Sequence, residues 1–121
     1  MSKRERKDYN FTAIDNRVKR VFLAEDNDLD YGDLAVYTYI AMFIQVGPNG
    51  RDGKPNGKQG YCYKTKAAMR AELRMSKGKL NRHIDNLKRF GFIDSRTVKN
   101  LYGGQDIEEY RLIDGWKRRL E

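Results

Sequence analysis

The sequence predicts an α+β domain in which three helices form the core and a β-hairpin follows them. Residues 34–44 are almost continuously apolar, and residues 65–90 repeat apolar side chains at helical spacing. Residues 92–113 alternate apolar and polar side chains on both sides of a Gly-Gly pair. The first two patterns are typical of a buried helix and of amphipathic helices, and the third is typical of two strands joined by a turn. A chain of 121 residues has room for one such domain.

The start of the chain is the least regular part of the sequence. Residues 1–10 are mostly basic and polar, and we expect them to form a flexible arm that precedes the domain at residues 11–121. Such an arm could lie along phosphates, and a solvated tail is an equal alternative. The mixed apolar and polar side chains of residues 11–24 predict a short strand and a helical turn that pack on the domain.

Acidic residues crowd together in residues 25–33. The alternation of Asp26, Asp28 and Asp30 resembles a calcium-binding loop. That loop needs Gly at its sixth position and Glu at its twelfth, and this chain has Tyr at both. We therefore place Asp30 or Asp33 at the N-terminus of the next helix, where a negative charge offsets the helix dipole.

Apolar side chains lie all the way round the helix predicted at residues 34–44. Such a helix must be covered on more than one side. We expect it to be the central strut between the N-terminal segment and the helices that follow. Part of its surface around Tyr37 or Tyr39 could instead face a second subunit, so a homodimer is left open.

Residues 46–60 have the composition of a loop, with five Gly, both Pro and two Asn. Lysines beside glycines also occur in phosphate-binding loops, but the spacing G-x-x-x-x-G-K-[ST] is absent. Gln59 follows the Gly-Lys pair, and Asp52 stands where the first Gly belongs. The sequence therefore predicts no nucleotide site, and no other cofactor or small-molecule site is evident. Residues 61–63 then predict a short strand that leads into the next helix.

A pair of helices joined by a three-residue turn is predicted after this loop. The hydroxyl group of Thr65 can cap the first helix, and Met69 and Leu73 lie one helical turn apart. In the turn, Met75 is the natural plug into the core, and Ser76 caps the second helix. This arrangement predicts two helices held at a fixed angle by the core.

The second of these helices has one apolar face and one basic, polar face. The apolar face repeats Leu80, Ile84 and Leu87, and Gly91 ends the helix. The opposite face carries Lys77, Gly78, Asn81, Arg82, Asp85 and Lys88. Gly permits close approach, Asn and Arg can pair with base edges, and lysines can neutralise phosphates. We interpret the two helices as a helix-turn-helix whose second helix enters the major groove of DNA, and a merely solvated face is the alternative.

The hairpin that follows carries basic and polar side chains. Arg96, Lys99 and Arg111 lie on its arms, and Asn100 and Tyr102 lie at its tip. Because the hairpin comes directly after the DNA-reading helix, we expect it to contact phosphates or the minor groove. Charges that only protect a sheet edge are the alternative.

Composition narrows the class of partner and the compartment. The formal net charge of +8 favours a polyanionic partner. Cys62 is the only cysteine, which excludes an internal disulfide framework and fits a reducing cytosol. No apolar run approaches about 20 residues, and no charged-then-apolar leader precedes a cleavage site. We therefore expect a cytoplasmic protein with no membrane partner.

Catalysis is not expected from the titratable residues. His83 is the only histidine, and the sequence places neither cysteine nor clustered carboxylates beside it to complete a metal site. Cys62 and His83 lack a recognisable third member of a nucleophile arrangement. We interpret both as packing or surface residues, and we predict neither an enzyme nor a metal site.

These elements in this order resemble the winged helix-turn-helix family, and more narrowly the N-terminal DNA-binding domain of replication initiators from Gram-positive plasmids and phages. The resemblance covers about residues 11–113. It rests on FTAIDNRV, LDYGDLAVYTYIAMF, the glycine-rich loop, YKTKAAMRAELRMSKGKLNRHIDNLKRFGFIDSRT and the closing hairpin. Arg74 stands where this family usually has Gly, before the hydrophobic residue of the turn, and the departure predicts a wider turn. The second domain that full replication initiators use to recruit partners is absent from these 121 residues.

The resemblance implies which residues contact DNA. The second helix would face DNA through five of its first six residues, all except Leu80, the start of the preceding helix would touch the backbone, and the hairpin would reach the adjacent groove. The residue pattern of the hairpin arms adds Arg96 to this set. The expected DNA-binding residues are Thr65, Lys66, Lys77, Gly78, Lys79, Asn81, Arg82, Arg96, Lys99 and Asn100.

These observations predict a double-stranded DNA-binding protein, and a sequence-specific regulator of transcription encoded on a plasmid, phage or other mobile element. One alternative is an accessory protein of replication initiation or conjugative transfer that binds origin DNA. Another is a winged helix that binds proteins, for which the acidic residues 25–33 could serve. Eight Tyr could provide stacking platforms for RNA or single-stranded DNA. Because Tyr37 and Tyr39 fall in the apolar helix, Tyr61 and Tyr63 flank a core strand, and no exposed aromatic array is evident, duplex DNA is favoured.

Overall fold

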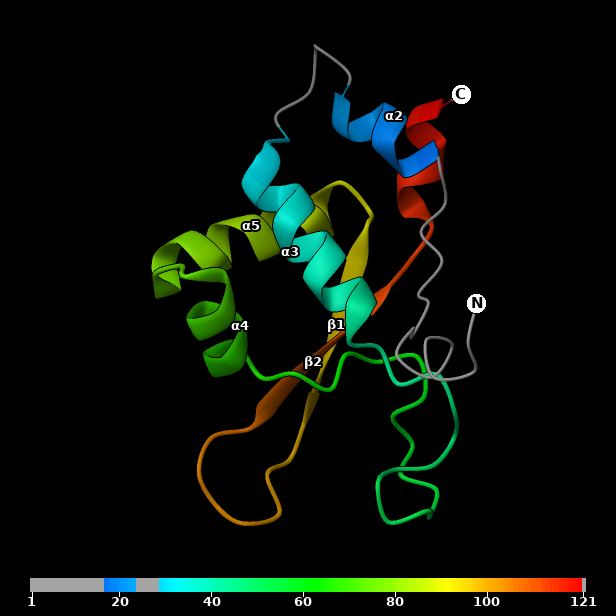
Figure 1. The fold of residues 1–121 in the computed structure, drawn as a ribbon, viewed down its shortest axis with the longest axis vertical. Coiled ribbons are helices and arrows are strands. Elements are labelled where there is room, and N and C mark those ends of the chain that lie inside the picture. Colours follow the sequence, from blue (N-terminus) through cyan, green and yellow to red (C-terminus); the bar gives the residue numbers. More distant parts are fainter. Residues whose placement is uncertain (1–16, 24–28, 121) are drawn as a thin grey trace, which may run out of the picture.

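The structure is a computed structural model that describes residues 17–23 and 29–120. Its elements, in chain order, are α2 (Arg17–Leu23), α3 (Tyr31–Met42), α4 (Lys66–Leu73), α5 (Lys77–Arg89), β1 (Ile93–Val98), β2 (Ile107–Leu112) and the 3₁₀ helix η1 (Gly115–Leu120). Figure 1 shows α3 at the centre, α4 and α5 beside it, and α2 next to η1 at the end opposite the hairpin tip. The expected α+β class, helices followed by an antiparallel hairpin, is confirmed. The basic arm at residues 1–10, the strand expected near residues 11–16 and the acidic residues 25–28 lie outside the described residues.

The start of α3 is set by two aspartates that cap each other. The Asp33 backbone N–H donates to the Asp30 carboxylate at 3.0 Å, and the Asp30 backbone N–H donates to the Asp33 carboxylate at 2.9 Å. This capping box satisfies two of the backbone donors that the first turn of a helix leaves unpaired. The helix therefore begins at Tyr31, three residues before the apolar run on which its prediction rested.

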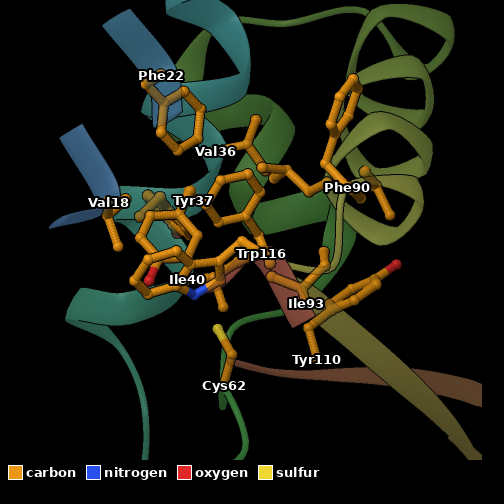
Figure 2. Packing of buried hydrophobic residues seen from close by; sticks show 14 of the residues in the cluster. Val18, Phe22, Val36, Tyr37, Ile40, Cys62, Phe90, Ile93, Tyr110 and Trp116 are labelled. Atoms are coloured by element: carbon orange, nitrogen blue, oxygen red, sulfur yellow. The ribbon is translucent and has the colours of Figure 1, made fainter. Parts of the chain in front are cut away.

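The central position of α3 is confirmed. The Phe22 ring of α2 lies 6.0 Å from the Tyr37 ring, while α4, α5 and β2 contact other sides of the helix. Tyr37 is 3% exposed and Tyr39 is 6% exposed. The suggestion that these two tyrosines face a second subunit is therefore wrong, because the chain's own core covers them. Figure 2 shows Tyr37 within this core.

Aromatic rings form the centre of the core around Phe92, the residue just before β1. Its ring lies 4.7 Å from the Phe22 ring and 5.5 Å from the Tyr37 ring, and it stacks on the Trp116 ring at 5.9 Å. Figure 2 shows Phe22, Tyr37 and Trp116 pointing toward one another from three different elements. The aromatic cluster thus joins α2, α3 and η1 to the base of the hairpin.

Gly91 ends α5 and lets η1 close on the core. Its φ is +80°, a left-handed conformation that disfavours any residue with a Cβ. A Cβ at this position would also lie 2.7 Å from the backbone of Gly115. The Trp116 backbone N–H donates to the Gly91 carbonyl at 3.0 Å, which fixes the tryptophan against Phe92. The predicted helix stop at Gly91 is confirmed, and Trp116 lies in the 3₁₀ helix η1.

The two predicted caps and the three-residue turn between α4 and α5 are confirmed. The Thr65 hydroxyl accepts from the Ala68 backbone N–H at 3.1 Å, and the Ser76 hydroxyl accepts from the Lys79 backbone N–H at 3.2 Å. The expectation of a wider turn is wrong. Arg74 adopts φ +56°, the left-handed conformation that a Gly would take there without strain, so the turn stays tight.

The hairpin has the predicted extent, with β1 and β2 antiparallel and in register from the Ile93–Leu112 pair to the Val98–Ile107 pair. Residues 61–63 do not form the predicted strand. Tyr61 makes a single bridge to Arg111, and Cys62 makes a single bridge to Ile44. The chain turns into α4 immediately afterwards, so each side of this segment has room for only one pair.

Replacing Ile84 with Ala should lower the free energy of unfolding by about 2–5 kcal/mol, because the side chain is 1% exposed and its loss leaves a cavity between α5 and the core. Urea unfolding followed by circular dichroism measures the change. The matched control is Ile107→Ala, whose side chain is 36% exposed on the hairpin and should lose less than about 1 kcal/mol. Equal losses would place Ile84 outside the core.

Replacing Arg74 with Gly should raise the free energy of unfolding by about 0.5–1 kcal/mol, because Gly adopts φ +56° without the Cβ clash. The same replacement at Arg70, inside α4, should lower stability by up to about 1 kcal/mol through lost helix propensity. Thermal melts of the two variants beside the wild type give the comparison. If Arg74→Gly is less stable than the wild type, the interpretation that Arg74 is strained in this turn is wrong.

Candidate nucleic-acid interface

The solvent-facing side of α5 carries cations around a glycine in its first two turns. Lys77, Lys79 and Arg82 are exposed, and within residues 17–23 and 29–120 no hydrogen bond or ion pair occupies their side chains. Gly78 is also exposed, and a Cβ added there would meet nothing within 4 Å. Neither packing nor internal pairing therefore accounts for a glycine and three cations at these positions.

Asn81 and Lys66, both expected to contact DNA, lie together. The Lys66 Nζ donates to the Asn81 Oδ1 at 3.0 Å, which joins the start of α4 to the exposed side of α5. Thr65 is close to this pair in sequence, but its hydroxyl is used by the helix cap. Arg70, which the sequence analysis did not single out, is exposed one helical turn after Lys66. Its i+4 spacing from Lys66 places it on the same edge of α4.

Arg96 has an internal role on the hairpin. Its Nε donates to the Glu109 carboxylate at 3.0 Å, its Nη2 donates to the Gly57 carbonyl at 2.9 Å, and its guanidinium lies 3.8 Å from the centre of the Tyr61 ring. Glu109 is 5% exposed and also pairs with Lys58 at 2.9 Å. These contacts fasten the glycine-rich loop to the hairpin and occupy the polar end of Arg96.

The other polar residues of the hairpin divide into paired and free ones. Arg111 donates two hydrogen bonds, at 2.7 and 2.9 Å, to Asp94 directly across the strands, which lowers the pKa of the Asp94 carboxyl. The Asn100 side chain accepts from the Tyr102 backbone N–H at 3.0 Å and so shapes the tip. Lys99 is exposed, and its ammonium group has no hydrogen bond or ion pair in the described part of the chain.

A buried pair links α3 to α5 directly behind the exposed face. The His83 Nδ1 lies 2.8 Å from the Asp33 Oδ1, and the two side chains are 1% and 0% exposed. A carboxylate can only accept, so Nδ1 carries the hydrogen and donates. Gly32 leaves room for the imidazole, because a Cβ there would lie 2.3 Å from the ring. The ring therefore has one position, wedged between the first turn of α3 and its own helix.

His83 is a packing residue, as interpreted, but the statement that no carboxylates lie beside it is wrong. The fold brings Asp30 and Asp33 to it, with ligand atoms all within 4.8 Å of one another. Both carboxylates are engaged in the capping box, and Asp33 also accepts from His83, so their hydrogen bonds account for the cluster. Cys62 is buried as well, and burial raises the pKa of its thiol, which suits a packing residue.

No family model, curated protein sequence or solved structure matches this chain. Among the helices that the structure describes, each is too short or too polar to span a lipid bilayer.

Replacing Asp33 with Ala should lower the free energy of unfolding by at least about 2 kcal/mol, because it leaves the buried His83 N–H without an acceptor and opens the cap of α3. The control is Asp85→Ala, an exposed aspartate of α5 that should change stability by less than about 0.5 kcal/mol. Urea unfolding at neutral pH compares the two. A loss at Asp33 no larger than the loss at Asp85 would show that the buried pair does not stabilise the fold.

Proposed function

We propose that this chain is a winged helix-turn-helix protein that binds double-stranded DNA through the first two turns of α5. The observation that carries the proposal is the exposed group of Lys77, Lys79 and Arg82 around Gly78, which makes no hydrogen bond or ion pair through its side chains within residues 17–23 and 29–120. Cations beside a position of close backbone approach suit a helix that lies in the major groove against phosphates. The net charge of +8 gives the whole chain an attraction to a polyanion.

In this arrangement, Arg82 and Asn81 are the residues that recognise bases. Arginine pairs with guanine through two hydrogen bonds, and asparagine pairs with adenine in the same way. The bond from Lys66 holds the Asn81 amide in one orientation before DNA arrives. A phosphate that draws the Lys66 ammonium toward itself would release the Asn81 amide to pair with a base. Lys66 would then contact the DNA backbone, and Asn81 would recognise the base sequence.

The remaining cations suit the phosphate backbone. Lys77 and Lys79 flank Gly78 on α5, and Arg70 lies on the same edge of α4 as Lys66. Lys99 lies on the β1–β2 hairpin, which would be the wing of the winged helix-turn-helix. Such contacts release counterions, so affinity should fall steeply as salt is added. Arg96 and Arg111 are not included among them, because Glu109 and Asp94 hold their guanidinium groups.

We further propose that the biological role is sequence-specific regulation of transcription by a protein of a plasmid, phage or other mobile element. The resemblance of residues 11–113 to the DNA-binding domain of plasmid and phage replication initiators supports this assignment. An accessory role in replication or conjugative transfer would use the same surface on origin DNA.

Arg82→Ala should weaken binding to a cognate duplex by about 1–3 kcal/mol and relax the preference at one base position, because a bidentate contact to guanine is lost. The cognate duplex is first obtained by selection from a random pool. Fluorescence anisotropy at one fixed salt concentration then compares it with a scrambled duplex of the same length. The loss on the scrambled duplex should be much smaller, since only one charge among many is removed.

Arg89→Ala is the matched control, because Arg89 lies on the last turn of the same helix, where it donates to Asn86. Its removal should weaken both duplexes slightly and equally. Equal losses on the two duplexes for Arg82→Ala would make Arg82 a phosphate contact. If the wild-type protein fails to bind any duplex at low salt, the proposed function is wrong.

A further inference from the structure

The tip of the hairpin exposes two large apolar side chains that the fold does not use. Leu101 is 88% exposed and Tyr102 is 100% exposed. They are consecutive and lie between the last residue of β1 and the first residue of β2, at the far end of the hairpin from the core. Together they form a small apolar patch, and removing such a patch from water is favourable when a partner covers it.

The tip is a shaped turn. The Asn100 side chain accepts from the Tyr102 backbone N–H at 3.0 Å, and the Gly103 backbone N–H donates to the Asn100 carbonyl at 3.3 Å. Gly103 and Gly104 take φ values of +85° and +92°, which allow the chain to reverse directly after the apolar pair. The turn therefore presents Leu101 and Tyr102 at a defined place, and Asn100 is the residue that positions them.

The hairpin is joined to the helices that form the proposed DNA-binding face. The Lys88 Nζ of α5 donates to the Glu108 carboxylate of β2 at 3.1 Å. Burial alone would raise the pKa of Glu108, and its polar neighbours, among them the ammonium groups of Lys88 and Lys66, bring it below its usual value. Glu108 thus lies near the Lys66–Asn81 pair, and Figure 1 shows the hairpin extending beyond α4 from there.

The reach of the hairpin matches the spacing of DNA grooves. A strand rises about 3.3 Å per residue, so the tip lies at most about 20 Å beyond Glu108. One turn of B-DNA is about 34 Å, so the centres of adjacent major and minor grooves are about 17 Å apart along the axis. A duplex with its major groove on α5 would therefore have its next minor groove within reach of Leu101 and Tyr102. Lys99, two residues before Leu101, is exposed and would supply a cation for phosphates on the same approach, while Asp106 is the acidic side chain closest to the tip in sequence.

We propose that Leu101 and Tyr102 form a wedge that enters the minor groove and partly unstacks a base step, bending and unwinding the bound duplex. This inference rests on the proposed duplex-binding function. Leucine is one of the residues that proteins insert between base pairs, and a tyrosine ring can stack on an exposed base. Pyrimidine–purine steps unstack most easily, so such a step should recur half a helical turn from the α5 contact in the preferred sites.

The test combines a topology measurement with a binding measurement on the full chain. A relaxed, closed circular plasmid is incubated with the protein and topoisomerase I at low salt, and the linking number is then read on a gel. The wild type should shift the linking number in proportion to bound protein. The double variant Leu101→Ala, Tyr102→Ala should remove most of this shift while its affinity for a linear duplex, measured by anisotropy, changes by less than about tenfold.

The matched control is Val46→Ala, an apolar side chain that is 77% exposed in the glycine-rich loop, away from the hairpin tip. It should shift the linking number as the wild type does. The proposed wedge role of Leu101 and Tyr102 is wrong if the wild type binds duplex DNA without changing the linking number. It is also wrong if the double variant changes the linking number as much as the wild type does. In both cases the proposed binding of duplex DNA is unaffected. A wild type that binds neither plasmid nor duplex overturns the proposed function itself.

Discussion

The carboxylate of Asp33 joins the two helices on which the rest of the structure depends. It accepts from the Asp30 backbone N–H, which closes the first turn of α3, and it accepts from His83 at 2.8 Å, which fixes α5 against that turn. His83 has to point inward to make this bond, and the 100° step of a helix then places Gly78 and Asn81 on the opposite side. The exposed face of α5 is therefore set from behind by one buried hydrogen bond.

The exposed cations of this surface divide into those that a carboxylate holds and those that no ion pair occupies. Arg96, Arg111 and Lys88 all lie on or beside the hairpin, and each is held by a carboxylate across a strand or an element boundary. Lys77 and Lys79 have no such carboxylate among the residues that the structure describes, and Arg82 interacts electrostatically with the Asp30 carboxylate without forming an ion pair. Positive charge alone would not separate the two groups. Their pairing does, because a cation that is already bonded to a carboxylate has fewer donors left for another anion.

Much of the fold could be predicted from local sequence because its rules act over a few residues. The caps at Thr65 and Ser76, the stop at Gly91 and the alternation of the hairpin depend on neighbours within one or two turns. Pairs between distant positions could not be predicted. His83 meets Asp33 across 50 positions, and Arg96 meets Glu109 and Gly57 from separate segments. From the sequence alone, Arg96 cannot be distinguished from an unpaired cation, and His83 cannot be distinguished from a histidine without a carboxylate partner.

Arg74 shows how packing can impose a conformation that the local sequence disfavours. A turn this tight needs a left-handed residue, and Gly would supply it without strain. The turn nevertheless forms, because Met69 of α4 and Leu80 of α5 are both fully buried and hold the two helices in place from either side. The core therefore holds Arg74 in its strained conformation, while the side chain of this residue is exposed to solvent.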